Sequence, residues 1–391
     1  MRVAVLLLAI PLLVLGSRDD GWGPYGEVCL VGQPQLYDPR KSMGNDRNYT
    51  IDLDQDPYHR WDQVGQEMAP KISAALETVQ MMLSLVPGSY DFLVQLSLSG
   101  IDNVAEPYQT EMKGMSAASG ISLGEIALMN MFYEIAKGCT SIVAQTPSGK
   151  IYHARNQDFG FLFIWNITMK DWQQTLALKD ALIQVNFVQK GKLVFKGTTF
   201  AGHMGILTGI VPGGFTLSTN ARFGSTYNNM VDFFVNGVIG RQFILYMDRD
   251  VLTQCDDYAC AMNFLSTYPM LASGYFIVGG KNRNEGAVIT RGPNGTVHTE
   301  TLDSRNQDKW YVLETNYDWD KNVIFLDDRR GPGHDCMNRL GQTNIGLSGL
   351  FQVLSSKPNL NKATVYTSVM QVDDGILESY IQNCDDPCWF V

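Results

Sequence analysis

The feature of this sequence that most constrains its fold is a single cysteine, Cys139, which separates two segments of different character. Before it, residues 109–119 and 123–136 have the apolar spacing of helices. After it, residues 140–144 and 150–154 flank a turn of sequence Thr-Pro-Ser-Gly and predict a β-hairpin. If the chain were cut before Cys139, one residue would carry both a thiol and an α-amine, which together are a nucleophile with its own base.

The N-terminus has the pattern of a secretory signal peptide. One early positive charge precedes an apolar run over residues 3–15, and Gly16 and Ser17 follow it. The run is shorter than the roughly 20 residues that cross a bilayer. We therefore expect a signal peptide over residues 1–17, a mostly helical segment over 18–138 and a strand-rich segment over 139–391.

Three sequons fit a protein that passes through the secretory pathway. They begin at Asn48, Asn166 and Asn294, and each predicts N-glycosylation. The formal net charge is −10, and no cluster of Lys and Arg offers a stripe for phosphates. A nucleic-acid partner is therefore not expected.

The seven cysteines are an odd number, which leaves one free thiol or one intermolecular disulfide in an oxidising compartment. If Cys139 is the free thiol, six cysteines remain for three bridges. Cys384 and Cys388 are spaced to close a tight loop, and Cys255 and Cys260 either pair or stay as buried thiols. The remaining pair is Cys29 with Cys336, which would join the two sides of Cys139.

The order of the predicted elements indicates the fold class. Helices come first, then paired strands, a helical block over about 229–266, and further paired strands. This order favours an α+β domain with antiparallel sheets covered by helices. Within the first helical run, from Tyr58 to Val86, we expect an interruption at Pro70.

Two other chemistries were weighed against a cysteine nucleophile that becomes N-terminal. Ser122 lies in a Gly-x-Ser-x-Gly motif, but a helix rather than a strand is predicted before it, so an N-cap role is favoured. A papain-like enzyme would pair Cys139 with His298 or His334, but the local papain signature is absent. The histidine and cysteine spacings match no common zinc site, and no metal or cofactor is expected.

The sequence around Cys139 resembles the acid ceramidase family. The motifs that carry the resemblance are Cys-Thr-Ser-Ile-Val-Ala from Cys139 and His-Ala-Arg-Asn-Gln-Asp-Phe-Gly from His153. Further matches are Phe-Ala-Gly-His-Met-Gly from Phe200, Thr-Asn-Tyr-Asp from Thr315 and Phe-Leu-Asp-Asp-Arg-Arg from Phe325. N-acylethanolamine acid amidase is a near relative of that family, and bile salt hydrolases are more distant.

The resemblance implies a fold, a maturation step and a set of site residues. The fold is the αββα sandwich of N-terminal-nucleophile hydrolases, preceded by a helical α chain. A cut between Gly138 and Cys139 would release a β chain that begins with the nucleophile. The implied catalytic residues are Cys139, Arg155, Asp158, Asn220, Asn316 and Arg329.

Each implied residue has an expected role. Arg155 favours the thiolate, Asp158 orients the new α-amine, and Asn316, with Asn220 or backbone amides, donates to the oxyanion. Arg329 either positions the nucleophile or the substrate, or makes a structural ion pair with an aspartate at 327 or 328. The sequence departs from the family at Ala221, where an acidic residue is common.

The implied activity is hydrolysis of ceramide to sphingosine and a fatty acid in the lysosome, reached through the secretory pathway, with secretion as a second destination. A saposin-type activator would assist at the membrane, and the two chains would stay linked by a disulfide. The alternatives are an N-acylethanolamine acid amidase and an inactive secreted lipid-binding homologue. The apolar stretch over residues 89–98 fits either the border of a lipid groove or a core helix.

Overall fold

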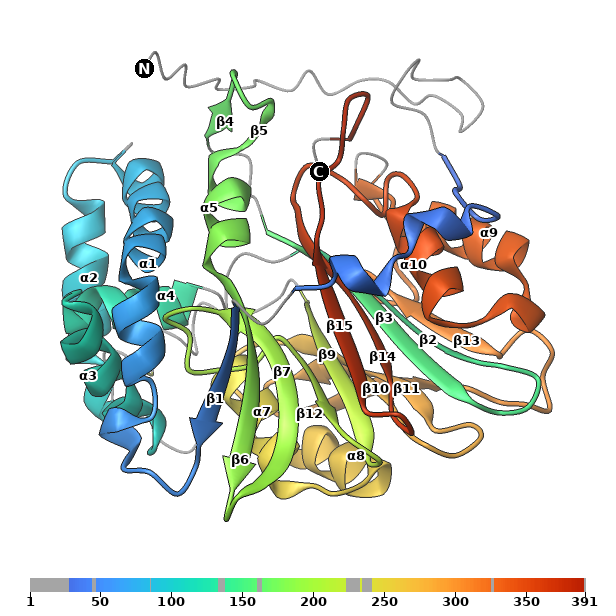
Figure 1. Ribbon diagram of the computed structural model, residues 1–391, viewed down its shortest axis with the longest axis horizontal. Helices are drawn as coiled ribbons and strands as arrows, with labels where there is room; N and C mark the ends of the chain where they lie inside the picture. Colours follow the sequence, from blue (N-terminus) through green and yellow to red (C-terminus); the bar gives the residue numbers. More distant parts are fainter. Residues whose placement is uncertain are drawn as a thin grey trace.

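The core of the protein is a pair of β-sheets that lie face to face between helices (Figure 1). The computed structural model describes residues 28–43, 47–84, 86–132, 138–159, 164–222, 233, 241–324 and 327–389. Two short strands, β4 (Trp165–Asn166) and β5 (Asp171–Trp172), form a separate ribbon. The predicted α+β class is confirmed.

The larger sheet has the strand order β1-β6-β7-β8-β9-β10-β11-β12 in the described part of the chain. Its strands are β1 (Asn48–Asp52), β6 (Leu182–Gln189), β7 (Lys192–Phe200), β8 (Thr208–Val211), β9 (Phe215–Ala221), β10 (Gly274–Gly279), β11 (Gly286–Gly292) and β12 (Gly295–Thr301). Strand β1 pairs with β6 in parallel, and the other neighbours are antiparallel. The segment before Cys139 therefore contributes an edge strand to a sheet whose other strands follow Cys139.

The smaller sheet has the order β13-β2-β3-β14-β15, and all of its pairs are antiparallel. Its strands are β2 (Gly138–Gln145), β3 (Ile151–Asp158), β13 (Tyr311–Glu314), β14 (Thr364–Gln371) and β15 (Ile376–Ile381). The hairpin predicted after Cys139 is confirmed as β2 and β3. Because β2 and β3 lie inside this sheet and pack against β9 and β10, the start of β2 is buried between the sheets.

Helices cover both outer faces of the sandwich. Helices α7 (Ile244–Gln254) and α8 (Tyr258–Thr267) pack on the larger sheet. Helices α9 (Arg330–Leu340) and α10 (Leu347–Ser355) pack on the smaller one. The layers are thus α, β, β and α, as expected. Residues 223–232 and 234–240 of the predicted helical block lie outside the described residues.

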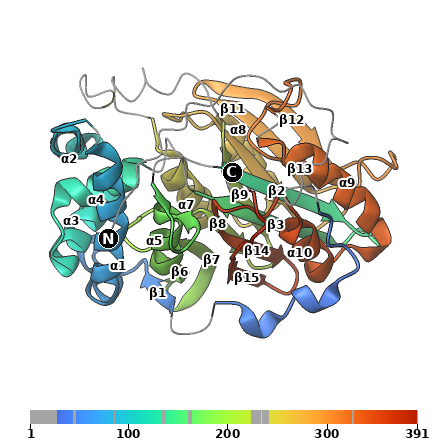
Figure 2. The same cartoon turned by 90° about the horizontal axis from the view of Figure 1, so that it is seen from above.

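A group of helices from the N-terminal segment lies beside the sandwich (Figure 2). Its members are α1 (Asp62–Leu83), α2 (Ser89–Ser99), α3 (Tyr108–Ser119) and α4 (Leu123–Phe132). Helix α1 packs on α3 and on α5 (Gln173–Ala181), which belongs to the segment after Cys139. Contacts of this kind join the two segments into one body.

The expected interruption at Pro70 is wrong, because α1 continues through this residue. An interior proline costs a helix about 3 kcal/mol. Val64, Met68 and Ile72, on both sides of Pro70, are buried in the main core. Burial of such side chains stabilises by about 1.5–3 kcal/mol each, which exceeds the cost of the proline.

Three disulfides are present among the described residues. Cys29 pairs with Cys336, Cys255 with Cys260, and Cys384 with Cys388. Cys139 is buried and takes part in none of these three disulfides. Of the interpretations left open for the Cys255–Cys260 pair, the structure has the bonded one.

Candidate active site

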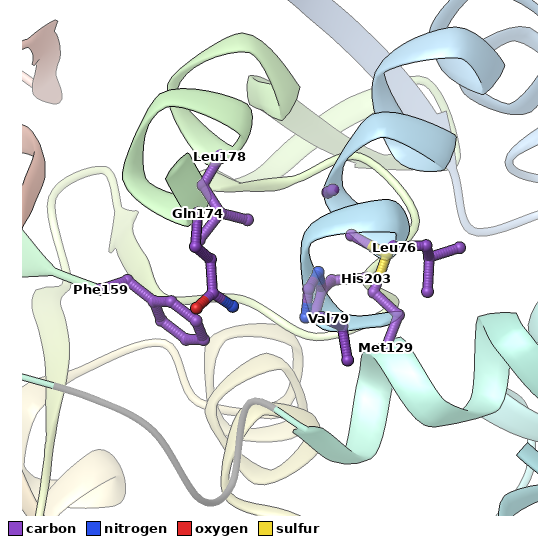
Figure 3. A pocket seen from close by; sticks show the side chains of 8 residues that line it. Leu76, Val79, Met129, Phe159, Gln174, Leu178 and His203 are labelled. Carbon is purple, nitrogen blue, oxygen red and sulfur yellow. The ribbon is translucent and has the colours of Figure 1, made fainter. Parts of the chain in front are cut away.

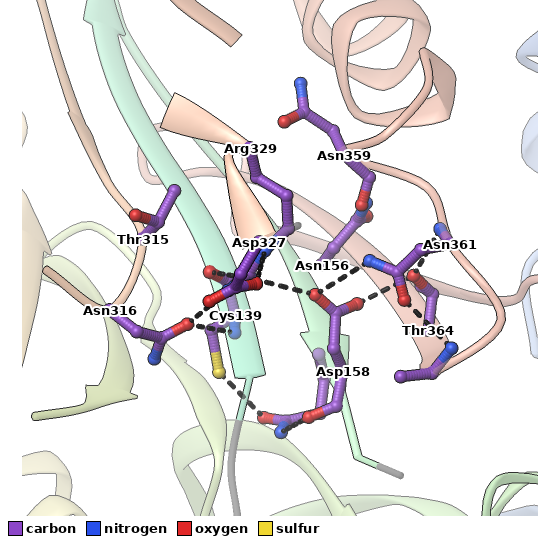
Figure 4. A network of polar contacts seen from close by, with 12 residues as sticks. Cys139, Asn156, Asp158, Thr315, Asn316, Asp327, Arg329, Asn359, Asn361 and Thr364 are labelled. Atoms are coloured by element: carbon purple, nitrogen blue, oxygen red, sulfur yellow. Dashed lines mark hydrogen bonds and ion pairs between the residues drawn. The ribbon is translucent and has the colours of Figure 1, made fainter. Parts of the chain in front are cut away.

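The thiol of Cys139 lies in the space between the two sheets (Figure 4). Its residue is 0% exposed at the start of β2. The sulfur lies 3.9 Å from the carbonyl oxygen of Thr219 on β9 of the facing sheet. The thiol is therefore fully enclosed.

Strand β3 places a cation against this sulfur. Cys139 is directly opposite Gln157, and Arg155 is two residues away on the same face because side chains alternate along a strand. The Arg155 Nη2 atom donates to the Cys139 Sγ atom at 2.8 Å. Arg155 also donates to the carbonyl of Leu207 at 2.6 Å, which fixes the guanidinium between the sheets.

Gln157 is a site residue that the sequence prediction did not name. Its Oε1 atom accepts from Arg155 and lies 3.8 Å from the sulfur. Its Nε2 atom donates to the carbonyl of Asp158 at 3.1 Å. The alternation of β3 alone would have placed Gln157 beside Arg155.

Asp158 lies on the opposite face of the smaller sheet from Arg155. Its Oδ1 accepts from the Thr364 hydroxyl at 2.7 Å, and its Oδ2 accepts from Asn361 at 3.4 Å. Arg329 contacts the same Oδ2 at 3.0 Å. Burial raises the pKa of Asp158, although Arg329 and the hydrogen bonds from Thr364 and Asn361 oppose this effect. The carboxylate thus depends on these donors to stay ionised.

Arg329 connects the parts of the site. Its guanidinium donates to the carbonyl of Cys139 at 2.6 Å, to Asn316 Oδ1 at 2.8 Å and to Asp327 at 3.0 Å. Burial lowers the pKa of Arg329, but Asp327 and Asp158 raise it more, so the net shift is upward. Both roles considered for Arg329, the ion pair with Asp327 and the contact with the nucleophile, are present in its geometry.

Asn220 and Asn316 differ in how many of their side-chain amide hydrogens are already used in hydrogen bonds. Asn220 donates to the backbone carbonyls of residues 314 and 315, both at 2.9 Å. Asn316 donates to the carbonyl of Ala221 at 2.8 Å and accepts from the Cys139 backbone nitrogen at 2.9 Å. An amide nitrogen has two hydrogens. Asn220 therefore uses both on the backbone, and Asn316 has one hydrogen for another acceptor.

The surroundings of the Cys139 nitrogen bear on the role expected of Asp158. In the uncut chain this backbone nitrogen donates to Asn316 Oδ1, and Arg329 lies between it and Asp158, so the role expected of Asp158 toward the α-amine of a cut chain stays a prediction. Gly138 lies against Asp158, since a Cβ atom at Gly138 would be 3.2 Å from the Asp158 Cβ atom.

A small apolar pocket lies where α1, α4 and α5 meet (Figure 3). Its lining includes Leu76, Val79, Met129, Leu178 and Phe159, and Phe159 directly follows Asp158. The pocket therefore adjoins the end of the strand that carries Arg155 and Asp158.

Two other sequence patterns have structural roles. Ser122 accepts a hydrogen bond from the Glu125 backbone nitrogen at 3.3 Å and caps α4, as expected. His334 shares a hydrogen bond of 2.7 Å with the Tyr311 hydroxyl. In the part of the chain that the structure describes, no group of three or more His, Cys, Asp or Glu side chains is placed to bind a metal ion.

Comparison with known proteins decides the family. Acid ceramidase of Pan troglodytes is 41% identical over 395 residues, which are 99% of this chain and 98% of that protein. The chain belongs to the acid ceramidase family. Human acid ceramidase is 40% identical over 346 residues, 87% of each chain.

Matches to family models and to a solved structure agree with membership of the acid ceramidase family. The model of linear amide C-N hydrolases, choloylglycine hydrolase family, matches residues 139–330. The model of the beta subunit of N-acylethanolamine-hydrolyzing acid amidase matches residues 44–105. The Caenorhabditis elegans ortholog of that amidase is 30% identical with a TM-score of 0.51, over 63% of this chain and 100% of that structure.

Proposed function

We propose that this protein is a ceramide amidase, which hydrolyses the amide bond of ceramide to sphingosine and a fatty acid. Relatives described as acid ceramidases match nearly the whole chain, and this similarity carries the proposal. The contact between Arg155 and the Cys139 sulfur supports a cysteine nucleophile, because a nearby cation favours the reactive thiolate.

We further propose that the chain becomes active by cutting itself before Cys139. The thiol attacks the carbonyl carbon of Gly138, the C–N bond to Cys139 breaks, and the nitrogen takes a proton. This step frees the amine of Cys139 and leaves Gly138 as a thioester on the sulfur, which water then hydrolyses to the Gly138 carboxylate and the free Cys139 thiol. The match to amide hydrolases begins at Cys139, and the enclosed sulfur of the uncut chain fits a zymogen.

In the cut enzyme, the free amine of Cys139 would accept the proton of its own thiol. The amine would stay within hydrogen-bonding distance of the side-chain Oδ1 atom of Asn316. With Gly138 displaced, it would also face the carboxylate of Asp158. The sulfur then attacks the ceramide carbonyl, and the ammonium protonates the leaving sphingosine nitrogen. Water hydrolyses the acyl-thioester and restores the thiol.

The oxyanion that forms on the substrate carbonyl needs a donor, and Asn316 fits this role better than Asn220. Asn316 has one amide hydrogen that its backbone contact does not use, whereas Asn220 uses both. One such donor is typically worth about 3 kcal/mol of barrier. We assign Asn220 to positioning, because it ties the end of β9 to the end of β13.

The acyl chain of the substrate is proposed to enter beside Phe159, where the small apolar pocket would have to widen to hold it. The pocket lining comes from both sides of Cys139, so the two chains would form it together. None of the described helices is both long enough and apolar enough to span a membrane. Because ceramide is nearly insoluble in water, we propose that it is reached at a membrane surface with the help of a saposin-type activator.

The lysosome is the proposed location, with the secretory pathway as the route. The proposed signal peptide would direct entry, and glycans on the three sequons would mark passage. Asn48 and Asn294 are exposed, and Asn166 is half-buried. The bridge between Cys29 and Cys336 would keep the α and β chains joined after the cut.

The test is to incubate the purified protein in acidic buffer with ceramide or palmitoylethanolamide and to quantify the released fatty acid. We expect ceramide to be hydrolysed faster and the Cys139→Ala variant to be neither cut nor active. Preference for palmitoylethanolamide would favour the alternative amidase, which the similarity to the C. elegans ortholog supports. A Cys139→Ala variant with wild-type activity would rule out the nucleophile.

A further inference from the structure

The carboxylate of Asp158 is held by a segment that lies more than 200 positions away in the sequence. Thr364 donates its hydroxyl to Oδ1 at 2.7 Å and Asn361 donates its amide to Oδ2 at 3.4 Å. Both belong to residues 357–364, which connect α10 to β14 and which we call the support segment. The donors also fix each other, because the Asn361 backbone nitrogen donates to the Thr364 hydroxyl at 3.1 Å.

The C-terminal disulfide loop, residues 384–388, packs against this support segment. The two cysteines are buried and form a small apolar cluster with Leu360. The Cys384 sulfur lies 3.7 Å from the Leu360 carbonyl oxygen, a van der Waals contact, because a disulfide sulfur has no hydrogen to donate. The disulfide therefore touches the support segment one residue before Asn361.

Two lysines of the support segment bind the same loop. Lys362 is 7% exposed, and its ammonium lies 3.1 Å from the Asp386 carboxylate. Its backbone nitrogen donates to the carbonyl of Trp389 at 2.7 Å. The ammonium of Lys357 donates to the carbonyl of Asp385 at 3.1 Å. The loop, with Trp389 directly after it, thus holds the support segment by main-chain, ionic and apolar contacts on both sides of Asn361.

We propose that the disulfide loop over residues 384–388 is a positioning element for Asp158 and is required for full catalytic activity. The inference rests on the proposed amidase function, in which Asp158 faces the α-amine of Cys139. The loop itself touches no reacting atom. It acts through Asn361 and Thr364, whose hydrogen bonds set the position and the charge of the carboxylate.

The charge of Asp158 gives the proposal a specific signature. The groups that face its carboxylate are Arg329, Asp327, Asn361 and Thr364. Burial raises the pKa of this carboxyl group, and the hydrogen bonds from Thr364 and Asn361 lower it. If the support segment shifts, these donors are lost and the ionised form becomes rarer in acid. The acid limb of the pH–rate profile should then move to higher pH.

The experiment compares two disulfides of similar span. Cys384→Ser/Cys388→Ser removes the loop closure, and Cys255→Ser/Cys260→Ser is the matched control at the junction of α7 and α8. For the first variant we expect kcat on ceramide to fall about 10- to 100-fold with little change in KM. Its acid limb should move up by about one pH unit. The control should keep the wild-type acid limb.

Milder variants separate positioning from loss of folding. Thr364→Val should reproduce the shift of the acid limb, Thr364→Ser should restore it, and Asp386→Asn should shift it partly. Equal effects of both disulfide variants, or an unchanged acid limb in the first variant, would overturn the proposal.

The rate of self-cleavage before Cys139 is a second readout that needs no lipid. If the wild-type protein cuts itself but leaves ceramide intact, the proposed substrate is wrong. The loop can then still be judged by whether its variant cuts more slowly than the control. Because Arg329 bonds both the Asp158 carboxylate and the Cys139 carbonyl in the uncut chain, a displaced Asp158 should slow the cut, and an equal cutting rate would overturn the proposal.

Discussion

Glu314 is a buried carboxyl group at the end of β13, one strand away from Cys139. It is 7% exposed, and its Oε1 atom has no hydrogen-bond partner. Burial raises its pKa from 4.5 to about 8, while Arg330 opposes the shift. At acidic and neutral pH the folded protein therefore carries a neutral Glu314.

This shift predicts that the folded protein is more stable in acid. Between pH 4.5 and about 8 the folded state keeps a proton on Glu314 that the unfolded state loses. The free energy of unfolding should therefore fall by up to roughly 1.4 kcal/mol for each pH unit across this window. Thermal unfolding of Glu314→Gln should show a flatter decline from pH 5 to 8 than the wild type.

The exposed Glu77→Gln variant is the control for this measurement, and it should keep the wild-type slope. If Glu314→Gln declines as steeply as the wild type, Glu314 is ionised in the folded protein and the assigned pKa shift is wrong.

Helices α3 and α7 meet through a buried ion pair that crosses the boundary at Cys139. Glu111 on α3 accepts from Arg249 on α7 at 2.7 Å and from the Trp61 indole at 2.9 Å. The Arg249 guanidinium also lies 5.1 Å from the centre of the Tyr108 ring. A buried pair that loses one partner typically costs 3–5 kcal/mol, because the other charge stays buried alone.

We expect this pair to hold the two chains together after the proposed cut, even without the disulfide between Cys29 and Cys336. In size-exclusion chromatography under reducing conditions with rising denaturant, the chains of Glu111→Gln should separate at a lower denaturant concentration than those of the wild type. Lys71→Met is the control. The ion pair of Lys71 with Asp180, 3.0 Å between Nζ and Oδ2, crosses the same boundary, but both side chains are exposed. Separation of the control at the same lower concentration would mean that the buried pair is not decisive.

The success of sequence-based prediction differed between local and distant features. The hairpin of β2 and β3 was predicted because its turn and strands are contiguous. Helix α9 was missed because Gly331, Pro332 and Gly333 fall in its first turns and disfavour a helix. Its contact with β13 and the bridge from Cys29 to Cys336 stabilise it, and neither is visible in local sequence.

The residues of the site divide in the same way into those that local sequence predicts and those that depend on distant contacts. Alternation along β3 separates Arg155 from Asp158 by face, so the placement of Gln157 beside the sulfur was predictable from sequence. The contacts of Asn361 with Asp158 were not, because they depend on how α10 and β14 are joined in space. The resemblance brought Asn220 and Asn316 to attention, but only their hydrogen bonds distinguish a tie between strands from a candidate oxyanion donor.

The whole molecule is two segments built around one core, and the bridge between Cys29 and Cys336 spans them. After maturation, we expect a single species by electrophoresis without reductant and two species with it. Mass spectrometry should find Cys139 as the N-terminal residue of the larger fragment. Two separate species without reductant would mean that this bridge is absent from the mature protein.

Strand β1 lies in the larger sheet beside β6, and the segment before Cys139 therefore supplies part of the architecture of the segment after it. Neither product of the cut would be an independent folding unit. A gene split at codon 139 should yield insoluble halves, and mixing the purified halves should not rebuild the enzyme. Synthesis as one polypeptide is thus a requirement of assembly, and the peptide bond before Cys139 is needed only until folding is complete.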